Sequence, residues 1–345
     1  MFDFGNANDG QRKAISAAEG PVLITAGPGT GKTYTLVQRT IYLIEECNVK
    51  PESIFVATFT EKAAKELITR ITNELSNRGI AANINEMYIG TFHSLCLRIL
   101  KEHLEYTRLR RNYRLLDAFD QQYMVFQNIH RFRSIPQIEI ALPNGGAWKQ
   151  AAAVCNYVNN LSEELVTPEE LMADADQSIA ALGRMLKEYR DILAEGNLMD
   201  FSSIQIEAYH LLRENAEILD ELRSQITHLM VDEYQDTNFI QEQLVFLLAG
   251  DRKNICVVGD DDQSIYKFRG ATIENILNFE KLYPGTKTIR LEQNYRSTSN
   301  ILNAANCVIQ HNTERKGKTL WTDNGEGDKV QVYTAENEQD EASHI

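Results

Sequence analysis

Residues 22–33 combine the side chains and the backbone pattern that hold a chain of phosphates. An apolar run leads into a glycine-rich turn, which ends in Gly-Lys-Thr and opens a helical pattern that continues to Glu46. In the closely similar pattern G-x-x-x-x-G-K-[ST], backbone N–H groups at a helix start cradle the phosphates. Ala26 stands where the first glycine of that pattern belongs, but a residue leaving a strand has a negative φ and needs no glycine. The alternative is an ordinary Gly/Pro turn.

The candidate phosphate loop gives its two polar side chains separate roles. Lys32 is expected to reach the β- and γ-phosphates, and the hydroxyl of Thr33 to ligate Mg²⁺. The residues that we expect at the nucleotide in this stretch are Ala26, Gly27, Pro28, Gly29, Thr30, Gly31, Lys32 and Thr33.

Two adjacent carboxylates follow a second apolar run, within residues 228–233. Asp232 is expected to hold Mg²⁺ through its water shell, and Glu233 to accept a proton from the attacking water. Acidic pairs at strand ends also arise by chance. The phosphate loop lies about 200 residues upstream, however, and that spacing fits a domain inserted between two halves of one nucleotide-hydrolysing core.

Short apolar runs, each followed by a helical pattern, predict a parallel sheet covered by helices on both faces. The predicted strands are residues 22–26, 54–59, 88–92, 228–233, 255–260 and 287–291, of which the last is expected to open another domain. Ligands of such sheets bind at the carboxyl ends of the strands, where both candidate motifs lie. The alternation stops within residues 115–205, where helical patterns predict an inserted helical domain.

Charge places few limits on the partner. The net charge is −14, yet residues 1–135 hold 17 Lys and Arg against 14 Asp and Glu, whereas residues 136–345 hold 18 against 35. Arg108, Arg110, Arg111 and Arg114 form a basic run, for which a solvated helix face is the simpler interpretation. Bulk charge therefore neither indicates nor excludes a nucleic acid partner.

Cysteine usage and hydropathy favour a cytoplasmic protein without a membrane partner. The five cysteines are scattered and include no Cys-x-x-Cys pair, which is typical of reduced thiols and indicates no metal site. No apolar run approaches the roughly 20 residues of a membrane span, and the first residues show no signal pattern.

Seven stretches, in order, resemble the motifs of superfamily 1 DNA helicases of the UvrD/Rep/PcrA type. They lie at residues 8–12, 26–33, 57–64, 90–94, 231–238, 258–266 with 268–271, and 291–297. The resemblance runs from end to end of the chain and implies an α/β fold: a RecA-like P-loop NTPase sheet, an inserted all-helical domain and the start of a second RecA-like domain. The implied boundaries are 1–114 and 206–286 for the first motor domain, 115–205 for the helical insertion, and 287–345 for part of the second motor domain.

The resemblance also implies roles around the nucleotide, with ATP and Mg²⁺ as cofactors. Gln11 resembles the glutamine that recognises adenine through its amide, although an exposed polar residue at a helix start is the alternative. Tyr295 resembles the aromatic that stacks on adenine, and Tyr34 stands where the family often has an arginine near the nucleotide. Gln263 resembles a γ-phosphate sensor, and Arg296 an arginine finger. The implied catalytic residues are Lys32, Asp232, Glu233, Gln263 and Arg296.

The implied DNA contacts include several aromatic side chains. Aromatic faces stack on successive bases of a single strand without recognising the sequence, contributing roughly 1–3 kcal/mol per base. Without the resemblance, Phe59 and Phe92 would be assigned to the core. Phe268 and Lys267 stand where the family often has Trp and Gly, so we expect a smaller stacking face and a lysine able to reach a phosphate. The implied DNA contacts are Phe59, Thr91, His93, Tyr266, Phe268 and Arg269.

The implied function is an ATP-dependent DNA helicase or translocase that moves 3′→5′ on single-stranded DNA. It would act at single/double-strand junctions in DNA repair or replication, with protein partners that the sequence does not identify. Two alternatives stay open. One is a motor subunit of a recombination helicase–nuclease, and the other is a nucleotide switch or DNA-binding module without unwinding activity.

The family's last motifs, including a second phosphate-contacting arginine, do not occur in these 345 residues. We therefore expect an N-terminal portion that binds nucleotide but does not unwind DNA. A strand-separation assay checks this expectation, and robust unwinding by the 345-residue chain would contradict it.

Overall fold

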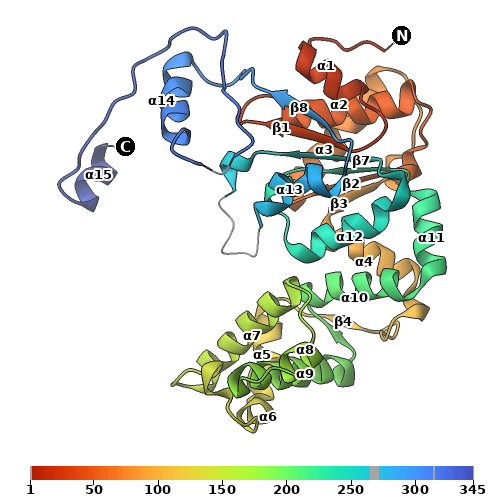
Figure 1. The fold of residues 1–345 in the computed structure, drawn as a ribbon, viewed down its shortest axis with the longest axis vertical. Coiled ribbons are helices and arrows are strands. Elements are labelled where there is room, and N and C mark those ends of the chain that lie inside the picture. The colour runs from red at the N-terminus through yellow and green to blue at the C-terminus, as the bar shows by residue number, and fades with distance from the viewer. Residues whose placement is uncertain (1, 265–271, 314, 345) are drawn as a thin grey trace.

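The computed structural model describes residues 2–264, 272–313 and 315–344, which form an α/β body and a separate helical lobe (Figure 1). The body holds a six-stranded sheet in the order β3-β2-β6-β7-β1-β8, with every neighbouring pair parallel. The strands are β1 (Val22–Ala26), β2 (Ile54–Thr58), β3 (Tyr88–Thr91), β6 (His228–Val231), β7 (Ile255–Gly259) and β8 (Lys287–Leu291). All six predicted strands are present, each ending within two residues of its predicted end.

Strand β8, which was expected to open another domain, extends the six-stranded sheet. It does not open a second sheet but forms the edge of the first one, paired with β1 from Val22↔Lys287 to Ala26↔Leu291. The pattern of β8 alone could not show this, because an apolar run does not indicate which strand it pairs with. The predicted domain boundaries stay a prediction.

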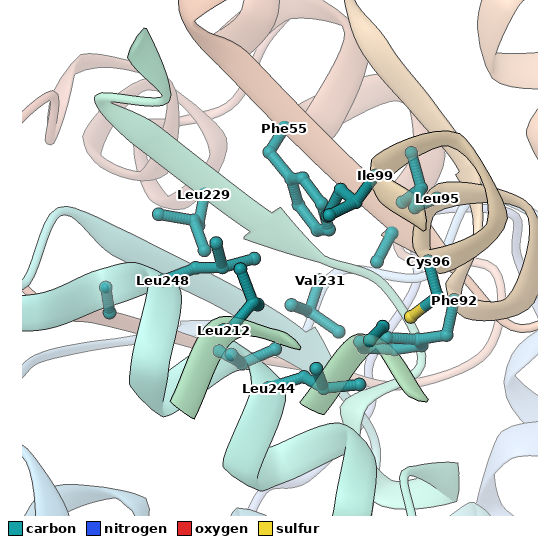
Figure 2. Close-up of a cluster of buried hydrophobic side chains, with 14 of the residues drawn as sticks. Phe55, Phe92, Leu95, Cys96, Ile99, Leu212, Leu229, Val231, Leu244 and Leu248 are labelled. Atoms are coloured by element: carbon teal, nitrogen blue, oxygen red, sulfur yellow. The ribbon is translucent and has the colours of Figure 1, made fainter. Parts of the chain in front are cut away.

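Alternate residues of the central strands enter two cores on opposite faces of the sheet. Leu23 and Phe55 point to one face, and Ile24 and Val56 to the other. The first core (Figure 2) is covered by α4 (Phe92–Glu102), α10 (Phe201–Glu214), α11 (Ala216–Gln225), α12 (Phe239–Ala249) and α13 (Glu274–Leu282). The second is covered by α1 (Asp9–Ser16), α2 (Lys32–Glu45) and α3 (Glu61–Asn77). Phe92 lies in the first core, which confirms the core assignment made for it from the residue pattern alone.

The helical lobe has a hydrophobic core of its own. It comprises α5 (Ala118–Gln127), α6 (Ile129–Arg133), α7 (Ala147–Glu163), α8 (Pro168–Met172) and α9 (Gln177–Gly196). The chain enters and leaves the lobe through two segments, which pair as a short parallel ladder between β4 (Arg114–Leu115) and β5 (Leu198–Met199). The ladder interrupts the otherwise helical pattern that the sequence predicted for this region.

After β8 the described chain forms α14 (Ser299–Ile309) and α15 (Glu338–His344). The segment between these helices returns to the body, where Trp321 forms an isolated bridge with Gln293. Within the described ranges, no helix combines the length and apolar character that a membrane crossing requires.

Leu212 on α10 tests the packing of the first core (Figure 2). Because its side chain is fully buried, we expect Leu212→Ala to lower the free energy of unfolding by about 2–5 kcal/mol through lost contacts and a cavity. Urea denaturation measures the change. Leu282→Ala is the matched control, since Leu282 is 43% exposed, and a similar loss for both variants would contradict the assignment.

Candidate active site

The phosphate loop connects β1 to the N-terminus of α2. Ala26 is the last residue of the strand and fully buried, so no glycine is needed there. Gly29 and Gly31 have φ values of 72° and 85°, where a side chain would strain the backbone. A Cβ on Gly29 would lie 2.7 Å from the side-chain nitrogen of Asn294, so this glycine also permits close approach of the segment after β8.

A cavity of about 490 Å³ lies at the phosphate loop and brings together most of the residues predicted at the nucleotide. It is lined by Pro28, Gly29, Gly31, Lys32, Thr33, Tyr34, Glu66, Arg70, Glu233, Gln263, Tyr295 and Arg296. A neighbouring cavity of about 470 Å³ shares Thr33, Glu233 and Gln263 and adds Asp232 and Phe59. Four of the residues predicted at the nucleotide line neither cavity, namely Gln11, Ala26, Gly27 and Thr30.

Lys32 and Glu233 form an ion pair across the carboxyl edge of the sheet. The Lys32 Nζ lies 2.9 Å from Oε1 and 2.7 Å from Oε2 of Glu233. Glu233 follows β6 with a φ of 50°, a left-handed conformation that is uncommon for a residue other than glycine. Gln235 Nε2 donates a further hydrogen bond to Glu233 Oε2 at 3.0 Å. The lysine predicted to reach the phosphates and the predicted general base are thus in direct contact.

The carboxylates of Asp232 and Asp236 line the second cavity, and both have raised pKa values. Burial raises the pKa of Asp232 to about 7, and the negative charge of Glu233 adds to the shift. Burial and then Glu233 also raise the pKa of Asp236 to about 6. The buried Oδ1 of Asp236 has no hydrogen-bond partner among the described residues.

This donor set fits a magnesium ion. Asp232 and Thr33 line the same cavity and offer a carboxylate and a hydroxyl, which are the oxygen ligands that Mg²⁺ accepts. A divalent cation would also favour the ionised form of Asp232, which burial and then the negative charge of Glu233 oppose.

The segment after β8 is hydrogen-bonded to the phosphate loop. Asn294 Nδ2 donates to the carbonyl of Pro28 at 2.6 Å, and the N–H of Tyr295 donates to the carbonyl of Gly29 at 2.9 Å. The N–H of Arg296 donates to Asn294 Oδ1 at 2.8 Å. These bonds hold the backbone of Arg296 beside the cavity, which its side chain lines; its role as an arginine finger stays a prediction.

The residues predicted at the adenine differ in their availability. Gln11 is only 3% exposed, and its amide is engaged by the protein, since Nε2 donates to the carbonyl of Thr30 and Oε1 accepts from the N–H of Asn8. Tyr295 is 48% exposed and lines the cavity, and its hydroxyl accepts a hydrogen bond from Asn8 Nδ2 at 2.8 Å. Tyr34 also lines the cavity, and its hydroxyl donates to the carbonyl of Phe4.

Two of the predicted DNA contacts lie at the start of α4. Thr91 caps this helix through Oγ1, which also donates to Glu61 Oε1 at 3.0 Å. His93 contacts the amide of Gln205, and burial lowers the pKa of its imidazole. Phe59 lines the second cavity. The remaining predicted contacts, Tyr266, Phe268 and Arg269, lie outside the described residues.

Several residues of this region were not predicted from the sequence. Phe201 is 50% exposed and packs edge-on against His93, with ring centroids 5.8 Å apart. Its position directly after the capping residue Asp200 was the only signal, and that signal indicates a helix start and not a ligand site. Glu66 and Arg70 line the nucleotide cavity as an i,i+4 ion pair, a pattern that ordinary surface helices share.

A parallel sheet with a phosphate loop after β1 and a carboxylate pair after β6 defines a RecA-like P-loop NTPase of the α/β class. The family model described as "UvrD/REP helicase N-terminal domain" matches residues 7–284, and the model described as "UvrD-like helicase C-terminal domain" matches residues 289–345. The chain belongs to the UvrD/REP helicase family.

Curated relatives support this membership. The ATP-dependent DNA helicase PcrA of Staphylococcus epidermidis (strain ATCC 12228) is 43% identical over 346 residues, which cover 99% of this chain and 45% of the relative. PcrA of Staphylococcus aureus (strain NCTC 8325) is 40% identical over 344 residues, covering 98% of this chain and 44% of the relative. The chain thus spans about half the length of the curated relatives that it matches.

The raised pKa of Asp232 leads to a pH-dependent stability. An aspartate in the unfolded chain ionises near pH 3.9, whereas Asp232 in the folded protein ionises near pH 7. Asp232 therefore lowers the free energy of unfolding increasingly as the pH rises from about 4 to 7, and by its full amount above pH 7. We expect Asp232→Asn to raise the melting temperature more at pH 8 than at pH 5.

Thermal unfolding in the absence of nucleotide and Mg²⁺ measures this difference. Asp251→Asn changes an exposed aspartate in the short 3-10 helix Gly250–Arg252 and should have the same small effect at both pH values. An equal gain for Asp232→Asn at both pH values would show that its carboxyl group is not destabilised by burial.

Proposed function

We propose that the chain is the ATP-hydrolysing part of a DNA helicase or translocase that moves 3′→5′ on single-stranded DNA. The observation that carries the proposal is the cavity in which Lys32 and Glu233 meet Gln263 and Arg296. Lysine, general base, sensor amide and arginine are the set that phosphoryl transfer to water requires. The curated relatives bear the name ATP-dependent DNA helicase, which agrees with this chemistry.

The Lys32–Glu233 ion pair suggests how binding of ATP would make the general base available. Lys32 can pair with Glu233 or with the phosphates of ATP, and the triphosphate carries more negative charge than a single carboxylate. When Lys32 turns to the phosphates, Glu233 loses its cationic partner and keeps only the hydrogen bond from Gln235 to Oε2, so Oε1 becomes available to accept a proton from water. Mg²⁺ at Thr33 and Asp232 would neutralise phosphate charge in the same complex. Binding of ATP and release of the base are therefore coupled through one lysine.

Gln263 and Arg296 approach the cavity from different parts of the chain. The amide of Gln263 can hydrogen-bond the γ-phosphate without adding charge, whereas Arg296 can stabilise the charge that builds up during transfer. Arg296 follows residues that are hydrogen-bonded to the phosphate loop, so its backbone is fixed while its exposed side chain can move. Closing and reopening of the cavity around ATP would then change how tightly the protein holds the DNA strand.

The DNA strand would cross the region near the start of α4. Phe59 and Thr91 were implied by family resemblance, and Phe201 adds an exposed ring beside His93. An uncharged imidazole next to an exposed phenyl ring suits stacking on bases more than pairing with phosphates. Alternate tightening and loosening of the contacts with the strand would move the protein along it. At a single/double-strand junction this movement would separate the duplex, in DNA repair or replication.

Two substitutions separate binding from hydrolysis. Lys32→Ala should abolish binding of a fluorescent ATP analogue, because the phosphates lose their main cation. Glu233→Gln should keep or strengthen binding, because Lys32 is released, while DNA-stimulated ATP hydrolysis falls about 100-fold or more.

Lys50→Ala is the matched control, since Lys50 has a highly exposed side chain whose ion-pair partner is a neighbouring surface glutamate. It should behave like the unsubstituted chain in both assays. Undiminished nucleotide binding by Lys32→Ala, or undiminished hydrolysis by Glu233→Gln, would reject the proposed mechanism.

A further inference from the structure

Three consecutive aspartates surround one buried lysine beside the nucleotide cavity. Asp260, Asp261 and Asp262 follow β7, and Lys318 lies in the segment after α14. The Lys318 Nζ is 2.6 Å from a carboxylate oxygen of Asp260, 2.9 Å from one of Asp261 and 2.7 Å from one of Asp262. The side chain of Lys318 is 3% exposed, and those of Asp260 and Asp261 are fully buried.

The geometry satisfies every proton of the ammonium group. Its three N–H donors face three carboxylates, in a place where the carboxylate oxygens lie within 4.8 Å of one another. Oxygens spaced so closely could bind a divalent cation, but Lys318 fills this position. Arg315 adds two hydrogen bonds to Asp262 at 2.9 and 2.6 Å, and the N–H of Lys316 donates to Asp261 at 2.7 Å.

The charges of this group stabilise the ionised forms of Asp262 and Lys318 in spite of burial. Burial raises the pKa of Asp262, but hydrogen bonds from Arg315 and Lys318 outweigh it and lower that pKa. Burial likewise opposes the charge of Lys318, yet the three aspartates together raise its pKa. Removing the lysine would leave buried carboxylates without their central partner.

The aspartates connect directly to two residues of the proposed mechanism. Gln263 donates its N–H to the carbonyl of Asp260 and its side-chain amide to the Asp260 carboxylate. The N–H of Asp260 donates to Gln235 Oε1 at 2.9 Å, and Gln235 Nε2 donates to Glu233. Hydrogen bonds therefore run from Lys318 through Asp260 to the sensor amide and to the general base.

The lysine and the aspartates belong to different parts of the family architecture. Lys318 falls within the match to the C-terminal domain model, whereas Asp260–Asp262 fall within the match to the N-terminal one. We propose that Lys318 is a positioning residue that fixes the 260–263 turn, and through it Gln263, for ATP hydrolysis. The inference rests on the proposed function, in which Gln263 contacts the γ-phosphate.

Lys318→Arg tests the position without removing the charge. A planar guanidinium cannot direct three donors from one atom to three carboxylates, so the turn should shift while the group stays paired. We expect DNA-stimulated kcat for ATP to fall about 10- to 100-fold while KM changes less than about threefold. Lys316→Met is the control from the same segment, because the partner of its side chain is Glu280, which is 45% exposed, and its kcat should be unchanged.

A double-mutant cycle assigns the effect to Gln263. Gln263→Ala should lower kcat by itself, and adding Lys318→Arg should lower it little further, because both changes remove the same contact. Additive losses, or normal kcat in a folded Lys318→Arg variant, would overturn the inference.

Near-ultraviolet circular dichroism establishes that the variants are folded. Should Lys318→Arg fail to fold, Asp262→Asn in the unsubstituted background removes one carboxylate while leaving Lys318 in place, and an unchanged kcat there would overturn the inference.

Hydrogen exchange tests the same inference without hydrolysis. The N–H groups of Asp260, Asp262 and Gln263 are all hydrogen-bonded within the turn or to Gln235. Lys318→Arg should speed their exchange about 10-fold or more, and unchanged exchange would overturn the inference. If the unsubstituted chain did not hydrolyse ATP at all, or Gln263→Ala had normal kcat, the proposed function would fail, while the exchange rates would still decide whether Lys318 holds the turn.

Discussion

Acidic side chains are concentrated at the carboxyl edge of the parallel sheet, and distant cations compensate their charge. Lys32 reaches Glu233 across 201 residues of sequence, and Lys318 reaches Asp260 and its two neighbours. Asp232 lies among these groups with its pKa raised by burial and by Glu233. Because uncompensated buried charge is strongly destabilising, the position of each cation determines the arrangement of the carboxylates, and with it the shape of the nucleotide site.

The same charge balance divides the site into an exchangeable part and a fixed part. The ion pair of Lys32 borders the cavity, where a polyanion can compete for the lysine. The ammonium of Lys318 is shielded from solvent and is surrounded by carboxylates on three sides. In the proposed mechanism, Lys32 changes partners during the reaction cycle, whereas Lys318 keeps its partners and holds the turn beside it.

Much of this arrangement could be predicted from the sequence, because the determining signals are local. Apolar runs located all six strands of the large sheet, and the motifs at strand ends placed Lys32 and Glu233 at the edge where the two side chains are in contact. Pairing over long range could not be predicted. Nothing in residues 287–291 indicates that they join β1, nothing in Lys318 indicates three aspartate partners, and the amide of Gln11 gives no sign that Thr30 and Asn8 engage it.

The position of β8 has a mechanical consequence. Its five residues pair in parallel with β1, and the chain then continues into the segment that is bonded to the phosphate loop. A pull along the strand axis would load this ladder in shear, so its hydrogen bonds would resist together and not break one after another. The edge of the sheet nearest the phosphate loop is therefore stiff toward tension transmitted from the residues after β8.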